Sequence, residues 1–107
     1  MEQMMDLDKK DYLISLFFQY ETLLTDTQKL YFKSYVLEDF SLKEIADAYQ
    51  VSRNAVYDAI HKIEEHLYTY EEKLKLFQKS QQRLELLNQY ELTQDKTLLK
   101  QLKAMDE

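Results

Sequence analysis

The chain contains no glycine, no proline and no cysteine among its 107 residues. Glycine and proline are the usual residues of tight turns and sharp helix stops, so their absence predicts an all-α protein whose helix ends are marked by polar caps. The lack of glycine also excludes a glycine-rich phosphate loop and a dinucleotide-binding fingerprint. The lack of cysteine excludes a disulfide framework and a cysteine-ligated zinc site.

Long apolar runs are missing as well. No uninterrupted run approaches the roughly 18 residues that suggest a transmembrane helix. The first twelve residues, MEQMMDLDKKDY, are acidic and lack the apolar core of a signal peptide. We therefore expect a cytoplasmic protein that does not associate with membranes.

Positive charge is scarce, and the net charge is −6. Residues 1–40 hold eight acidic and four basic side chains, residues 41–70 hold five and three, and residues 71–107 hold seven of each. Proteins that bind nucleic acid are more often basic, and the simplest interpretation of the acidity is solubility. The length allows one small domain with an extension, and 45% apolar residues support a small core.

Residues 41–60, SLKEIADAYQVSRNAVYDAI, have the pattern of a helix-turn-helix motif. Ser41 and Glu44 form a capping box at the start of one helix, and Ser52 can cap a second helix eleven residues later. Gln50 stands in the turn, where such motifs usually carry glycine because the position tends to need a positive φ. Apolar side chains fall where a three-helix core needs them, at Ile45, Ala46, Tyr49, Val51, Val56 and Ala59.

A motif of this kind presents the first turns of its second helix to the major groove of DNA. Arg53 and Asn54 are the candidates for base contacts. The full set of residues expected to contact DNA is Lys43, Ser52, Arg53, Asn54, Tyr57 and Lys62. The charge of the segment opposes this use, because residues 41–70 are acidic and phosphate neutralisation supplies much of the affinity for DNA.

Two helices are expected before the motif. The first, from about Asp8 to Leu23, has one apolar stripe made of Leu13, Leu16, Phe17, Tyr20 and Leu24. The second, from about Asp26 to Leu37, opens with a Thr25–Gln28 capping box and is expected to bury Leu30, Tyr31, Tyr35 and Val36. Phe40 precedes the Ser41 cap, where it can pack on Ile45 as a hydrophobic staple.

From Ser52 the helical pattern continues to about residue 78, a length of roughly 40 Å. Apolar residues recur at steps of three and four from Ile60 to Phe77, a heptad pattern that favours a supercoil with another helix. The pattern is short for a coiled coil, and a helix packed on its own domain is the alternative. We expect a homodimer, with contacts from Ile63, Leu67, Tyr70, Leu74, Phe77 and Leu84.

The C-terminal residues continue the helical pattern. Leu84, Leu87 and Tyr90 form an apolar face, and Thr93 or Asp95 can cap a last helix that carries Leu98, Leu99 and Leu102. Residues 73–83 hold four basic and no acidic side chains, either as a solvated surface or as a patch that contacts phosphates. We expect two regions: a helix-turn-helix domain over residues 1–70 and a helical extension over residues 71–107.

The sequence contains no pattern typical of a catalytic or metal site. His61 and His66 are five residues apart, so they do not share a helix face, and they are interpreted as ordinary surface or interface histidines. Glu64–Glu65 and Glu71–Glu72 are interpreted as solvated pairs. We therefore expect a protein that is not an enzyme and that needs no cofactor or metal.

Residues 23–74, which begin LLTDTQKLYF and end LYTYEEKL, resemble the YlxM family of small bacterial proteins. The same stretch is similar to region 4 of bacterial sigma factors, which reads the −35 promoter element. Members of the YlxM family are encoded beside the protein component of the signal recognition particle, which implies a regulatory part in that pathway. At the positions where sigma region 4 contacts bases, this chain carries Arg53, Asn54, Ala55, Tyr57 and Asp58, and the last three depart from the sigma pattern.

Two classes of function follow. The first is a DNA-binding regulator, a dimer that places two second helices in successive major grooves about 34 Å apart. The second is an acidic protein–protein adaptor that recognises the protein or the RNA of the signal recognition particle without reading a DNA sequence. The intact motif favours the first class, and the acidic charge favours the second.

Overall fold

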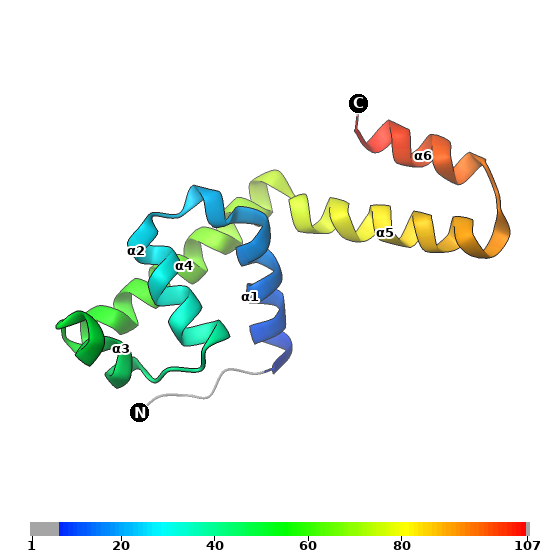
Figure 1. The fold of residues 1–107 in the computed structure, drawn as a ribbon. Coiled ribbons are helices and arrows are strands. Elements are labelled where there is room, and N and C mark those ends of the chain that lie inside the picture. Colours follow the sequence, from blue (N-terminus) through cyan, green and yellow to red (C-terminus); the bar gives the residue numbers. More distant parts are fainter. Residues whose placement is uncertain (1–6, 107) are drawn as a thin grey trace. The chain divides into compact units, whose positions relative to one another are not determined.

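The computed structural model describes residues 7–106, and this range is helical throughout apart from its connections. The elements are α1 (Leu7–Tyr20), a 3-10 turn (Glu21–Leu23), α2 (Asp26–Phe32), a π-helical turn (Lys33–Leu37), α3 (Leu42–Tyr49), α4 (Arg53–Leu74), α5 (Leu76–Thr93) and α6 (Thr97–Met105) (Figure 1). The prediction of an all-α helix-turn-helix bundle with a helical extension is confirmed.

The chain divides into two compact units, one ending at Lys73 and the other beginning at Leu74. We call them the motif unit, described from residue 7 to 73, and the hairpin unit, described from residue 74 to 106. The sequence placed the division at residues 70 and 71, three residues earlier. The outer ends of the two predicted regions, residues 1–6 and 107, lie outside the described residues.

The apolar stripe of α1 forms one side of the core of the motif unit. All five residues predicted for this stripe are buried, and the ring of Phe17 stacks on that of Phe32 with 4.9 Å between centroids. The stripe was predictable because its members recur at helical spacing. Phe32, which was not predicted to lie in the core, supplies the opposite side of this contact.

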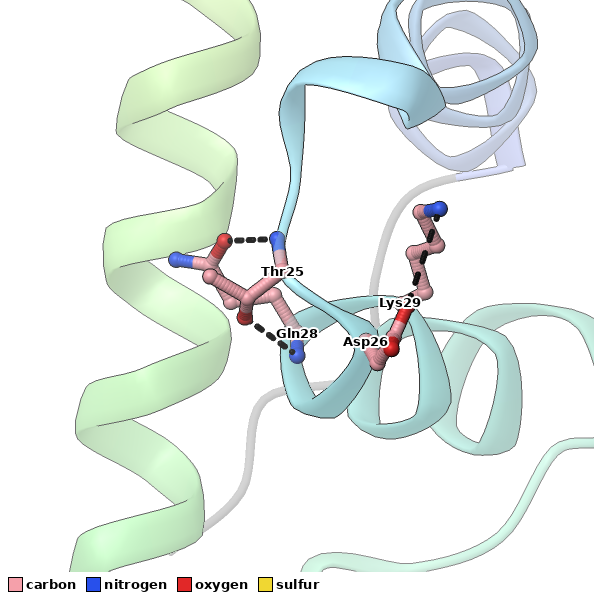
Figure 2. A network of polar contacts seen from close by, with 4 residues as sticks. All are labelled: Thr25, Asp26, Gln28 and Lys29. Atoms are coloured by element: carbon pink, nitrogen blue, oxygen red, sulfur yellow. Dashed lines mark hydrogen bonds and ion pairs between the residues drawn. The ribbon is translucent and has the colours of Figure 1, made fainter.

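A capping box opens α2, as predicted (Figure 2). The Thr25 hydroxyl oxygen accepts a hydrogen bond from the Gln28 amide at 3.1 Å, and the Gln28 side chain accepts one from the Thr25 amide at 2.8 Å. Two backbone donors at the helix start are thereby satisfied. Figure 2 also shows Lys29 beside Asp26, an exposed ion pair of 4.0 Å that contributes little to stability.

The segment after this cap is not a single α-helix, and its buried face was predicted incorrectly. The Glu38 amide donates to the Lys33 carbonyl over five residues, which makes the last turn π-helical. Phe32 and Val36, one turn apart, point into the core, whereas Leu30 is 50% exposed because it lies about 200° around the helix from Phe32. Tyr31 and Tyr35 are half-buried, and Ser34 is buried.

α4 packs along α1 through its far half. Lys9 lies 3.7 Å from Glu64, the ring of Tyr12 stacks on Tyr68, and the Tyr20 hydroxyl donates a 2.6 Å hydrogen bond to Glu71. Because successive residues of α1 meet successive residues of α4, the two helices run in the same general direction. The buried face of α4 consists of Val56, Ile60, Ile63 and Leu67.

The predicted continuous helix from Ser52 to about residue 78 is wrong. α4 ends at Leu74 because Lys75 adopts the left-handed conformation, with φ 55° and ψ 31°, and α5 begins at Leu76. A non-glycine residue in this region ends an α-helix at a cost of about 1–2 kcal/mol. The heptad frame that was predicted to run through Phe77 is therefore interrupted.

The hairpin unit pairs α5 with α6. The sides that face each other are only half-buried and comprise Arg83, Leu86 and Tyr90 on α5 with Leu98, Leu99, Leu102 and Met105 on α6. Leu86 was not predicted, and Leu84 and Leu87, which were, are exposed. The N-cap residue of α6 is Lys96 and makes no side-chain cap bond, so neither Thr93 nor Asp95 is the N-cap that was predicted. The Asp95 carboxylate instead accepts from the amide and the hydroxyl of Thr97, and these bonds hold the pKa of Asp95 below its usual value.

Candidate nucleic-acid interface

The turn between α3 and α4 is held by backbone hydrogen bonds. Gln50 adopts the left-handed conformation, with φ 57° and ψ 45°, as predicted from its place in the motif. The amides of Gln50 and Val51 both donate to the Ala46 carbonyl, which satisfies one of the carbonyls at the end of α3. The turn therefore forms even though Gln50 stands where such motifs usually carry glycine.

Both helices of the motif begin with side-chain caps. Ser41 accepts from the Glu44 amide at 3.0 Å, and Glu44 accepts from the Ser41 amide at 3.1 Å, so the predicted capping box is present. The Ser52 hydroxyl oxygen accepts from the Ala55 amide at 3.0 Å. These caps fix where α4 begins, and hence which side chains occupy its first turns.

All six residues that were predicted to contact DNA are exposed: Lys43, Ser52, Arg53, Asn54, Tyr57 and Lys62. Three of them, Ser52, Arg53 and Asn54, lie at the start of α4 or just before it. Lys43 belongs to the first turn of α3, and the others belong to the turn and to α4. Lys62 lies nine residues after Arg53, which is two and a half turns, so these two side chains leave opposite sides of α4. Arg53, Asn54 and Tyr57 share one side.

An aromatic pair extends this side of α4. Tyr57 is 55% exposed, and its ring lies parallel to the imidazole of His61, with 6.2 Å between centroids and 2° between planes. From the sequence, His61 was interpreted as an ordinary surface or interface histidine. The signal that could have found the pair is the spacing of four residues, which brings two rings onto one helix face. We call Arg53, Asn54, Tyr57 and His61 the groove face.

The charge around the groove face is mixed. Asp58 is exposed beside Tyr57, and Glu65 lies 3.4 Å from the Nε2 atom of His61. Arg53 and Lys62 therefore stand among carboxylates of the same helix. The groove face can offer hydrogen-bond donors, acceptors and a flat apolar surface, but it does not form a strong positive field.

Two of the residues assigned to the motif core are in fact exposed. Tyr49 and Val51 are 38% and 39% exposed, because they fall at the end of α3 and in the turn, where the chain leaves the core. Tyr49 instead meets the ring of Tyr31 edge-on at 4.9 Å. Ile45, Ala46 and Val56 are buried as predicted, and Ala59 is half-buried.

The residues predicted to make a dimer fall into two groups. Ile63 and Leu67 are fully buried inside the motif unit, and Tyr70 is half-buried with its ring 5.8 Å from that of Tyr20. The first half of the predicted stripe therefore packs within the chain, which corrects its assignment to a partner. Leu74 and Leu84 are exposed, and Phe77 is half-buried.

Within residues 7–106, no helix is long and apolar enough to cross a membrane.

The fold and the geometry of the α3–α4 turn define a helix-turn-helix protein. The chain matches the UPF0122 family, described as "Putative helix-turn-helix protein, YlxM / p13 like", over residues 7–106. It is 48% identical to a UPF0122 protein of Bacillus pumilus over 104 residues, covering 96% of this chain and 94% of that protein. It is 51% identical to the UPF0122 protein YlxM of Bacillus subtilis over 84 residues, which cover 78% and 76% of the two chains. The chain belongs to the UPF0122 family.

Proposed function

We propose that this protein binds duplex DNA with the first turns of α4 in the major groove and acts as a regulator. The observation that carries the proposal is the groove face, a set of exposed side chains at the start of a helix that the α3–α4 turn holds in place. An α-helix fits the major groove, and each base pair presents a distinct pattern of donors and acceptors there.

Each side chain of the groove face has a definite chemical preference. Arg53 can donate two hydrogen bonds to guanine, and Asn54 can bond to adenine through its amide. The Tyr57 ring, held parallel to His61, offers an apolar surface to the methyl group of thymine. The face is therefore suited to a short mixed sequence rather than to DNA of any sequence.

Few side chains are available to neutralise phosphates. Lys43 in the first turn of α3 and Lys62 on the flank of α4 are the basic candidates besides Arg53. Each neutralised phosphate contributes about −0.9 to the slope of log affinity against log salt concentration. We expect a slope of about −2, much shallower than that of a strongly basic DNA-binding protein.

Selection of a binding site from random duplexes, followed by fluorescence anisotropy at low salt, tests this proposal. Arg53→Ala should weaken binding to the selected site by about 1–3 kcal/mol, because a bidentate base contact is lost. Lys100→Ala, an exposed lysine of the hairpin unit, is the matched control and should leave the affinity unchanged. A lack of any bound duplex at micromolar protein would rule out DNA binding.

The acidic charge supports a second candidate function, an adaptor for a basic partner. The net charge of −6 and the carboxylates around the groove face weaken attraction to phosphate and favour a positively charged protein surface. In view of the resemblance to the YlxM family, the partner would be a component of the signal recognition particle.

Titrating the particle's protein and its RNA separately, at low and at moderate salt, tests whether this protein is such an adaptor. Binding to neither component would remove the adaptor.

A further inference from the structure

The hairpin unit has no core of its own. Within residues 74–106 every side chain is at least partly exposed, whereas the motif unit buries fourteen hydrophobic residues. Most of the stability of a helix in a protein comes from packing its apolar side, and a pair of helices with no buried residue lacks this contribution. The α5–α6 pair therefore needs a further surface to cover it.

The uncovered apolar surface lies along α5. α6 covers the side that carries Arg83, Leu86 and Tyr90, while Leu84 and Leu87 are 53% and 45% exposed. These two leucines are three residues apart and lie close to the middle of α5, so they form one patch. Leu76 lies on the same side as Leu87, because eleven residues complete about three turns. We call Leu84 and Leu87 the central pair.

The charge of the hairpin unit favours a second copy of itself as the cover. Residues 74–107 hold six basic and five acidic side chains, whereas residues 1–73 hold eight basic and fifteen acidic side chains. Two hairpin units can thus approach without net repulsion, unlike two motif units. A strongly charged partner would find little complementary field there.

The order of charges along α5 favours one direction of pairing. Lys75, at its start, and Lys79 lie in its first half, and Glu85 and Glu91 lie in its second half. Arg83 does not count toward this order, because it is already paired with Asp106 of α6 at 3.6 Å. In an antiparallel pair, the basic half of one α5 lies beside the acidic half of the other, whereas a parallel pair brings like charges together. A patch near the middle of a helix also meets itself in an antiparallel, two-fold arrangement.

We propose that the protein forms a two-fold dimer in which the α5 helices of two copies pack antiparallel, with the central pair near the axis. This surface is separate from the groove face, and the proposal does not depend on DNA binding. The leucines of the central pair provide the buried centre of the interface, and the charges of α5 set its direction.

Sedimentation equilibrium of the full chain tests the assembly. The wild type should show twice the 13.0 kDa chain mass at about 100 μM. The double substitution Leu84→Asp and Leu87→Asp should raise the dissociation constant at least about 100-fold, because two charges would be buried at the contact. Leu92→Asp is the matched control: Leu92 is 86% exposed and five residues from Leu87, on another side of α5, so its substitution should leave the dimer intact.

Circular dichroism should show that all variants keep the helices of the motif unit, so that a change of mass reports on association. A wild type with the mass of one chain at 100 μM would overturn the proposal. So would a dimer that persists in the double variant, or one that Leu92→Asp dissociates equally.

Engineered cysteines test the direction, since the chain has none of its own. In the antiparallel arrangement Leu84→Cys should form a disulfide between copies under mild oxidation, because residue 84 lies near the axis. Glu91→Cys should not, because the two copies of residue 91 would lie roughly 20 Å apart along the helices. Efficient cross-linking of Glu91→Cys would show that the helices do not pack antiparallel.

Discussion

The two units of this protein are both helical but differ in how their helices are stabilised. In the motif unit, the apolar stripes of α1 and α4 close on each other and on Phe32, and the core residues are almost fully buried. In the hairpin unit, α5 and α6 meet along one half-buried side only. The motif unit also has the two capping boxes, at Thr25 and Ser41, whereas α5 begins after a left-handed Lys75 without a side-chain cap.

This difference shows that helical periodicity alone does not make a stable unit. An amphipathic helix contributes to stability when a second apolar face meets it, and the free energy of opening a region follows its buried contacts. The hairpin unit should accordingly be the part of the chain that opens more readily. Single substitutions in the two units should show this difference in stability.

Removing a core side chain should produce the largest effect. Phe17→Ala should lower the free energy of unfolding by about 3–5 kcal/mol, because a fully buried ring stacked on Phe32 is lost and a cavity remains. Leu99→Ala in the half-buried side of α6 should cost less than about 1.5 kcal/mol. Urea denaturation followed by circular dichroism measures both, and equal losses would contradict the contrast between the units.

Removing a helix cap should have an intermediate effect. Ser41→Ala or Thr25→Ala should each cost about 1 kcal/mol, because the N3 amide loses its hydrogen-bond partner. Thr69→Ala, on the exposed surface of α4, is the control and should not destabilise the protein, since alanine favours the helix. The same urea titrations apply, and cap variants as stable as the wild type would show that these bonds contribute nothing.

Relieving the left-handed turn should have a smaller, stabilising effect. Gln50→Gly should raise the free energy of unfolding by about 0.5 kcal/mol, because the strain of a positive φ is removed while the unfolded chain gains freedom. Gln50→Val should destabilise, since a β-branched residue fits this conformation poorly. Thermal unfolding distinguishes them, and a destabilised glycine variant would contradict the assignment of strain to Gln50.

The smallest effect concerns the pH dependence of the start of α6. The pKa of Asp95 is lowered in the folded chain, chiefly by the Thr97 amide, so its ionised form stabilises the fold. This contribution is complete above the ordinary pKa of aspartate and is lost as the pH falls through the lowered value. The amide resonance of Thr97 should titrate with Asp95 at a pH below the ordinary pKa of aspartate, and Asp95→Asn should abolish this titration. An unchanged Thr97 resonance would contradict the hydrogen bond.

Much of the motif unit could be predicted because its signals are local. The stripe of α1, both capping boxes and the left-handed Gln50 follow from residue spacing and from the chemistry of caps. The break at Lys75 could not be predicted, because lysine has no special tendency toward a positive φ and the heptad spacing continues through it. The exposure of Leu30 was missed because Phe32 and Val36 set the phase of that helix, and only tertiary contacts decide between two apolar faces.

The candidate site was predictable in part for the same reason. The motif spacing identified Arg53, Asn54 and Tyr57 at the start of α4, where the structure exposes them. It did not identify the ring of His61 against Tyr57, because a histidine carries no apolar signal of its own. The ligand of the groove face and the association of the hairpin unit with a second copy depend on contacts outside a single chain, so both stay predictions.

The packing of tyrosines between α1 and α4 has a practical consequence for spectroscopy. The chain has no tryptophan, and eight of its nine tyrosines belong to residues 1–73, with Tyr90 the exception. Tyr12 stacks on Tyr68, and Tyr20 lies against Tyr70 and is hydrogen-bonded to Glu71. The near-ultraviolet signal of the protein therefore reports almost entirely on the motif unit, whereas the far-ultraviolet signal counts the helices of both units. A difference between the two unfolding curves would separate the units without any label.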